Sequence, residues 1–229
     1  YILAARPSMG KTAWAINVAQ HAALEENIPV LVFSLEMSAK QIALRMLSAE
    51  SRVNLREIFT SKIVQNDQWE GLREAGKRIS AGTPVCVDDT PSMTTLDMRS
   101  RCRNFFRSSK LGGSAQRGLI ILDYIQLMNS ARKVENRQQE VSDISRALKG
   151  IAREFNVPVL ALSQLSRDVE KRGGNKRPQL SDLRDSGAIE QDADCVMFLY
   201  REAYYQMEQN SSDASAELIL AKNRNGPTG

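Results

Sequence analysis

The sequence has few of the residues from which metal clusters, disulfide frameworks and membrane anchors are built. Its 229 residues include one histidine, His21, which lies in an apolar helical pattern. We therefore assign His21 a structural role and expect neither a histidine-based metal site nor a Ser/His/Asp triad. Three cysteines without paired spacing indicate no disulfide framework or zinc site and fit a reducing interior. No apolar run reaches the roughly 18 residues of a membrane span, and no signal peptide pattern opens the chain, so no membrane partner is expected.

What is present is typical of a folded globular chain. Hydrophobic residues make up 42% of the sequence and charged residues 25%. This length is enough to bury one substantial core, so residues 1–229 are expected to form one domain. The formal net charge of +4 is compatible with a polyanionic partner but too small to demonstrate one.

Short apolar runs alternate with helical patterns, which predicts an α/β fold with a mostly parallel sheet. The expected strands are 1–4, 30–34, 85–88, 119–123, 159–163, 195–200 and 217–221. The expected helices are 11–24, one from the Ser38/Gln41 capping box to about 50, one beginning near 67, 95–107 and 138–155. Arginines 99, 101, 103 and 107 spread over several helix faces and are expected to be solvated. Residues 164–192 are expected to form a long, locally basic, functional loop.

A phosphate-binding loop follows the first predicted strand. The run Ala5-Arg6-Pro7-Ser8-Met9-Gly10-Lys11-Thr12 stands between a strand and a helix, as a Walker A motif requires. Loop amides would face phosphates, Lys11 would reach the β and γ phosphates, and the Thr12 hydroxyl would ligate Mg²⁺. Ala5 replaces the first glycine of the pattern, which is tolerable if its φ stays negative.

Polar residues end three other predicted strands. Asp123 follows 119–122, where a Walker B carboxylate would hold Mg²⁺ through water. Glu36 follows 30–34 and either polarises the attacking water or is a solvated carboxylate at a helix start. Gln164 follows 159–163 and either senses the γ-phosphate or is a surface amide that begins a loop.

Six segments taken together resemble the motor domain of DnaB-type bacterial replicative helicases. They are ARPSMGKT, FSLEM, LIILDYIQLM, VPVLALSQLSR, LSDLRDSGAIEQDAD and KNRNGPTG, and the likeness spans nearly the whole chain. The resemblance implies a RecA-like P-loop NTPase fold, a homohexameric ring around single-stranded DNA, and ATP with Mg²⁺ bound between neighbouring subunits. It also implies a primase and a helicase loader as partners, and a location in the bacterial cytoplasm or a plastid stroma.

The resemblance further implies roles for individual residues. Positions matching the family's P-loop are Ser8, Met9, Gly10, Lys11 and Thr12. Glu36 matches its catalytic carboxylate, Asp123 its Walker B acid, Gln164 its γ-phosphate sensor and Arg45 a position near the nucleotide. Lys222 and Arg224 match a cationic pair that reaches into the next subunit's site. The positions that match a loop following the DNA backbone are Arg184, Asp185, Ser186 and Gly187.

Other functions are open on the residues alone. The P-loop and Asp123 also permit a RecA-like recombinase, another P-loop ATPase, a small-molecule phosphotransferase or a nonhydrolysing, nucleotide-gated DNA-binding module. Strand separation, homologous pairing and the phosphate acceptor distinguish these classes. Members of the family also carry an N-terminal helical domain and a last strand after the Gly-Pro turn, which residues 1–229 do not include, so ring assembly by this chain alone stays open.

Overall fold

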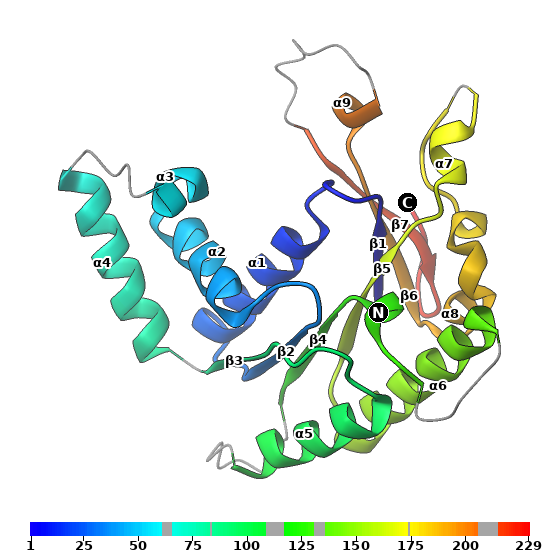
Figure 1. Cartoon of the computed structure of the whole chain (residues 1–229), viewed down its shortest axis with the longest axis horizontal. Coiled ribbons are helices and arrows are strands. Elements are labelled where there is room, and N and C mark those ends of the chain that lie inside the picture. The colour runs from blue at the N-terminus through cyan, green and yellow to red at the C-terminus, as the bar shows by residue number, and fades with distance from the viewer. Residues whose placement is uncertain (61–65, 83, 109–116, 131–135, 174, 206–214) are drawn as a thin grey trace.

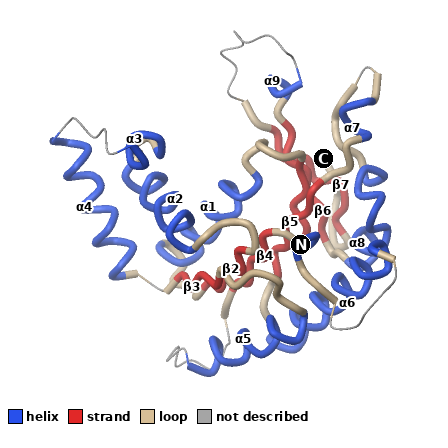
Figure 2. Tube along the Cα trace, in the orientation of Figure 1, coloured by secondary structure: helices blue, strands red, loops and turns tan. Residues whose placement is uncertain are grey.

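A computed structural model describes residues 1–60, 66–82, 84–108, 117–130, 136–173, 175–205 and 215–229. The side chains of residues 184–186 are also outside the described part. A seven-stranded sheet runs through the centre, with helices packed on both of its faces (Figures 1 and 2). The predicted α/β architecture is confirmed.

The sheet order is β3-β2-β4-β5-β1-β6-β7. The strands are β1 (Ile2–Ala5), β2 (Val30–Ser34), β3 (Val85–Asp88), β4 (Leu119–Asp123), β5 (Val159–Gln164), β6 (Cys195–Tyr200) and β7 (Glu217–Asn223). All neighbouring pairs are parallel except β6 and β7, which are antiparallel. Parallel pairing brings the carboxyl ends of β1, β2, β4 and β5 to one edge, where ligands bind in open α/β sheets.

Alternate residues of each strand face opposite helix layers, because successive side chains point to opposite faces of a sheet. Leu3 of β1 packs in the cluster with α1 (Lys11–Leu24) and α2 (Ala39–Ser51). Ile2 packs in the cluster with α5 (Thr95–Ser108) and α6 (Arg137–Phe155). The stripe of α6 that includes Ile144 and Leu148 is buried, as its helical spacing predicted. The capping box of Ser38 and Gln41 is also present.

The remaining elements lie at the periphery. α3 (Leu55–Thr60) and α4 (Asn66–Ala81) extend from α2, and η1 (Ile125–Leu127) follows β4. α7 (Asp168–Lys171), η2 (Leu180–Ser186) and α8 (Gly187–Asp192) lie between β5 and β6, and α9 (Glu202–Tyr205) follows β6. No helix in the described ranges is long and apolar enough to cross a membrane.

One expectation was wrong, and two further details were not foreseen. The segment 164–192 is not one long loop, because it contains α7, η2 and α8, whose buried residues include Val169, Leu183 and Ile189. His21 lies on α1, and its side chain is 69% exposed. The short α3 was not predicted, since it buries none of its residues and offers no apolar stripe.

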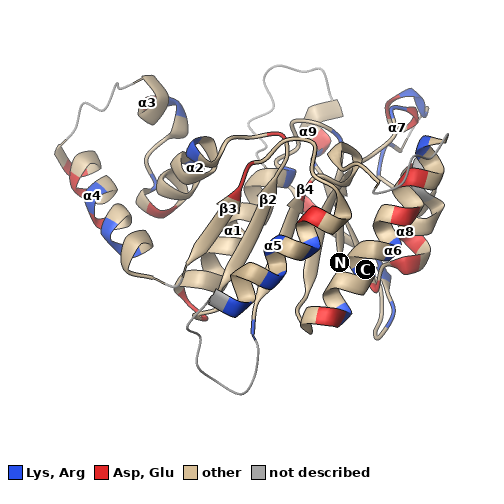
Figure 3. Ribbon diagram, turned by 60° about the horizontal axis from the view of Figure 1, so that its bottom comes forward, with Lys and Arg blue, Asp and Glu red and all other residues tan. Residues whose placement is uncertain are grey.

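Three of the four arginines of α5 that were expected to be solvated are accessible to solvent and also form ion pairs. Arg99 and Arg103 both contact Glu154 of α6, and Arg101 contacts Asp88 at the end of β3. Both signs of charge lie on α4, α5, α6 and α7 (Figure 3). These pairs lie on the outer side of the helix layer, where each adds little stability in high dielectric.

Candidate nucleotide-binding site

The loop between β1 and α1 has the backbone of a phosphate cradle. Ser8 and Gly10 adopt positive φ values of 64° and 93°. Glycine takes such a conformation without strain, whereas Ser8 holds it at a steric cost. Ala5 stays in the extended strand, so the alanine at the pattern's first glycine position meets no backbone conflict.

A cavity of about 370 Å³ opens beside this loop. It brings together residues from the β1–α1 loop, from α1 and α2, from the segments that follow β2 and β4, and from the end of β5, as the strand order predicts. The site residues predicted from the sequence that line it are Ser8, Gly10, Lys11, Thr12, Glu36, Arg45 and Gln164. Arg6, Pro7, Ala13, Met37 and Tyr124 complete the lining.

Thr12 and Asp123 form the pair suited to a hard cation. The Thr12 hydroxyl donates to Oδ2 of Asp123 at 2.6 Å, across the gap between α1 and β4. Oδ1 of Asp123 is buried and has no hydrogen-bond partner in the described part of the protein. Burial raises the pKa of Asp123, against the lowering effects of Thr12, Lys11 and Arg45. A buried oxygen without a partner beside a hydroxyl fits the oxygen ligands that Mg²⁺ prefers.

Lys11 supplies positive charge at the base of the cavity. Its Nζ lies 4.5 Å from the centroid of the Tyr124 ring. Burial lowers the pKa of Lys11, while Asp123 and Glu36 act in the opposite direction. The ammonium is therefore only partly compensated by its own chain, which suits a site for an anionic ligand.

Glu36 and Arg45 approach the cavity from the β2–α2 side. Glu36 is exposed, follows β2 and lies two residues before the cap of α2. Arg45 is half-buried, and its Nε is buried without a partner among the described residues. The backbone N–H of Leu35 donates to the Asp123 carbonyl at 2.8 Å, which holds the segment bearing Glu36 against the end of β4.

Gln164 is fixed through its backbone by Gln126, a residue that the sequence did not single out. The Gln164 N–H donates to Oε1 of Gln126 at 3.2 Å, and Nε2 of Gln126 donates to the Gln164 carbonyl at 3.1 Å. Nε2 also donates to the Ser163 hydroxyl at 3.0 Å. These hydrogen bonds orient the end of β5 while the Gln164 side chain lines the cavity.

Arg6 joins the P-loop to the segment after β5 and was also missed. It is 5% exposed, and its Nη1 donates to the Leu165 carbonyl at 2.7 Å. Its Nε donates to Oε1 of Glu170 in α7 at 2.8 Å. The signal in the sequence was an arginine inside a motif whose pattern leaves that position unspecified.

Other predicted site residues do not line the cavity. Met9 is 2% exposed, and its side chain packs in the core beside α1. Only the backbone of Met9 therefore contributes to the surface of the loop. Lys222 and Arg224 contact the C-terminal end of α8 instead. Gly187 is exposed at the start of α8, and the side chains of Arg184, Asp185 and Ser186 lie outside the described residues.

The basic character of residues 164–192 is partly neutralised within the chain. Lys171 contacts Asp168, Arg172 contacts the buried Asp182, and Arg177 contacts Glu217 of β7. Three cations of this segment are therefore paired with acids in the described part of the chain. Elsewhere in the described chain, no group of three or more His, Cys, Asp or Glu side chains is arranged for a metal.

The fold and the arrangement of this edge define a RecA-like P-loop NTPase domain. Residues 1–229 match the family model of the DnaB-like helicase C terminal domain, and the chain belongs to that family. It is 50% identical over 229 residues to the replicative DNA helicase DnaB of Geobacillus stearothermophilus, covering all of this chain and 48% of that protein.

Two solved structures agree with this assignment. A DnaB-like replicative helicase, described with its interactions with primase, superimposes with a TM-score of 0.91 at 39% identity. That match covers 100% of this chain and 53% of the other. A second structure, described as an ATPase domain, gives a TM-score of 0.90 at 39% identity, with 100% of this chain and 78% of the other covered. The chain spans about half the length of the curated relative it matches.

Proposed function

We propose that residues 1–229 are the ATP-hydrolysing motor domain of a replicative DNA helicase that translocates on single-stranded DNA and unwinds duplex. The observation that carries the proposal is the cavity in which Lys11, Thr12, Glu36, Arg45 and Gln164 meet beside the P-loop. Family membership over residues 1–229 supports it. The working form is a homohexamer in the bacterial cytoplasm or a plastid stroma, with primase and a loader as partners.

ATP is the nucleotide in this proposal. The amides of Ser8, Met9 and Gly10 and the start of α1 bind its phosphates, because N–H groups at a helix N-terminus attract anions. Lys11 compensates the charge of the β and γ phosphates. Arg45, with its unpartnered Nε, offers a further donor at the cavity wall.

In this proposal, Thr12 and Asp123 would hold Mg²⁺. The charge of the bound ion would offset the negative charge that develops on the phosphates. Glu36 accepts a proton from the attacking water, since an exposed carboxylate at the mouth of the cavity is placed for a general base. Gln164 hydrogen-bonds the γ-phosphate. When the γ-phosphate is lost, Gln164 shifts the conformation of the segment that begins at Leu165.

Lys222 and Arg224 act on the neighbouring subunit's nucleotide. Neither lines the cavity of its own chain, which supports a role in trans. Arg184, Asp185 and Gly187 contact the DNA backbone, where guanidinium and backbone N–H groups bind phosphate oxygens without reading the bases. Binding is then sequence-independent and weakens with salt.

ATP hydrolysis by the full-length protein, measured against increasing single-stranded DNA, tests the proposal. We expect turnover to rise and saturate with DNA, and K11A to abolish it, since the mutation removes the ammonium that compensates the phosphates. Glu36→Gln should keep nucleotide binding and lose hydrolysis. Turnover that is the same with and without DNA contradicts the motor function, and normal turnover in K11A contradicts the P-loop assignment.

A further inference from the structure

Lys222 and Arg224 are held at the C-terminal end of α8. Nζ of Lys222 donates to the Glu190 carbonyl at 2.5 Å. Nη2 of Arg224 donates to the Gln191 carbonyl at 3.0 Å. The last carbonyls of a helix lack partners within the helix, so cationic donors at this end satisfy them.

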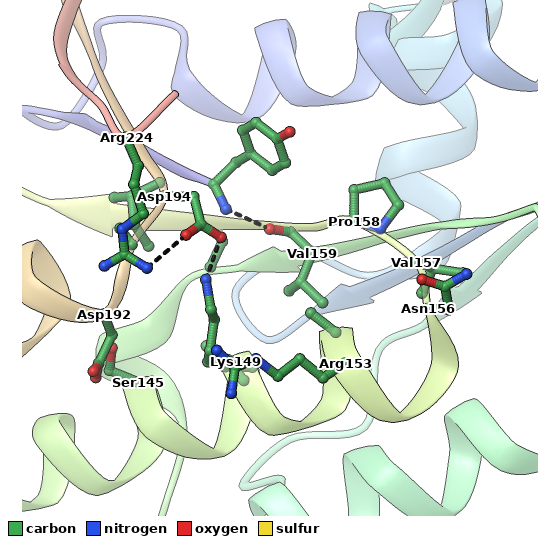
Figure 4. Close-up of a pocket in the computed structure, with 16 residues that line it drawn as sticks. Ser145, Lys149, Arg153, Asn156, Val157, Pro158, Val159, Asp192, Asp194 and Arg224 are labelled. Carbon is green, nitrogen blue, oxygen red and sulfur yellow. Dashed lines mark hydrogen bonds and ion pairs between the residues drawn. The ribbon is translucent and has the colours of Figure 1, made fainter. Parts of the chain in front are cut away.

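Asp194 gives Arg224 its only acidic partner in the described structure. Oδ1 of Asp194 accepts from Nη1 of Arg224 at 2.9 Å, and the Asp194 carbonyl accepts from the Arg224 backbone N–H at 2.8 Å. Figure 4 shows the guanidinium of Arg224 and the ammonium of Lys149 on either side of this carboxylate. Asp194 therefore contacts both the backbone and the side chain of Arg224.

Lys149 keeps the carboxylate in place from the opposite side. It extends from α6 and contacts Oδ2 of Asp194, which leaves Oδ1 to Arg224. The Lys149 hydrogen bond is the main cause that lowers the pKa of Asp194, with Arg224 contributing. The Arg224 side chain is still 47% exposed, and its guanidinium has further N–H donors beyond the two used here.

We propose that Asp194 is a positioning residue for Arg224, orienting its guanidinium from the end of α8 toward the nucleotide held by the neighbouring subunit. The proposal rests on the trans role of Arg224 given above. A guanidinium anchored by Nη1 and Nη2 keeps a fixed direction, whereas an unanchored arginine must lose rotamer freedom each time it engages phosphate. Asp194 touches neither nucleotide nor metal and acts only through Arg224.

The test is steady-state ATP hydrolysis by the full-length hexamer carrying Asp194→Asn, alone and combined with Arg224→Ala. We expect Asp194→Asn to lower kcat roughly 10- to 100-fold with little change in KM, because a misplaced group costs rate while the P-loop is untouched. Asp194→Glu should recover part of the loss. In the Arg224→Ala background, Asp194→Asn should have no further effect, since the residue it positions is gone.

Asp143→Asn is the matched control, because Asp143 of α6 pairs only locally with Arg146 and Gln139 among the contacts described. It should keep normal turnover. Unchanged or faster turnover in Asp194→Asn overturns the inference, and so does an equal loss of kcat with and without Arg224. If Arg224→Ala itself keeps normal turnover, the trans role fails first and the inference fails with it. If Asp194→Asn keeps normal turnover while Arg224→Ala loses it, the positioning role is contradicted and the proposed function stands.

Two further measurements separate positioning from a structural role. Thermal unfolding and hexamer mass are measured for each variant, and Asp194→Asn is expected to match the control in both. The positioning role is contradicted if Asp194→Asn unfolds at a lower temperature than the control and lowers kcat by the same factor with and without Arg224. Asp194 would then have only a structural role.

Discussion

Lys11 carries a charge that the free protein only partly compensates. Burial lowers its pKa below the usual 10.5. Nearby phosphates favour the charged ammonium and raise that pKa again. Between the two pKa values, nucleotide binding must take up a proton, so affinity falls as pH rises through the lower, free-state pKa.

We therefore predict that proton uptake on nucleotide binding is greater at alkaline pH than at neutral pH. Isothermal titration calorimetry in buffers of different ionisation enthalpy measures it. Lys11→Arg is the matched control, because a guanidinium stays charged throughout and removes the pH-dependent part. The same proton count at neutral and alkaline pH in the unmodified protein would rule out this interpretation of Lys11.

At the residue scale, the sequence predicted which side chains would form the site where they lie within one motif or at the end of a strand. The P-loop run placed Lys11 and Thr12, and strand ends placed Asp123 and Gln164 at the same edge. Gln126 and Arg6 escaped prediction because their roles depend on partners far along the chain, 38 and 164 residues away for Gln164 and Glu170. No local spacing encodes such contacts.

At the element scale, Arg6 ties the P-loop to α7. Glu170 is 37% exposed in its side chain and Arg6 is 5% exposed, so solvent screens the acid more than the base. Removing the acid leaves Nε of a buried guanidinium without its partner, which costs about 1–3 kcal/mol before screening reduces it. Arg6 also holds the β1–α1 loop, the proposed phosphate-binding loop, against the end of β5 through the Leu165 carbonyl.

We predict that Glu170→Ala lowers both the free energy of unfolding and the affinity for nucleotide. Urea unfolding and fluorescent-nucleotide titration measure the two effects. Lys171→Ala, at the adjacent position of α7 with a side chain 78% exposed, is the control and should change neither. Equal unfolding midpoints and affinities for Glu170→Ala and the control would show that the Arg6 contact has no role in shaping the loop.

The strands and long helices were predictable because their periodicity is local and their burial continuous. β2, β3, β4 and β6 begin and end where expected, whereas β5 extends beyond its predicted end by Gln164, and β7 by Lys222 and Asn223. The segment 164–192 was wrongly expected to be a loop. Its short helices bury only isolated residues such as Val169 and Ile189, so their stability comes from tertiary packing that no short window of sequence displays.

At the scale of the whole molecule, the predicted site residues fall into two places. One group surrounds the cavity at the P-loop edge of the sheet, and the pair Lys222 and Arg224 lies at the end of α8. A single chain therefore holds one part of the proposed machinery for its own nucleotide and another for a neighbour's. Head-to-tail contacts between identical subunits close into rings when the rotation allows. In the proposed hexamer, such contacts would bring these two places together at each interface.

Mixing two inactive full-length variants tests this central claim most directly. Lys11→Ala removes phosphate binding and keeps Arg224, while Arg224→Ala keeps the P-loop and removes the guanidinium. If Arg224 acts across the interface, mixed hexamers contain some interfaces with both parts intact, and ATP turnover should rise well above that of either variant alone. Turnover that stays at the level of the separate variants, with subunit exchange verified by mass, would contradict catalysis shared between subunits.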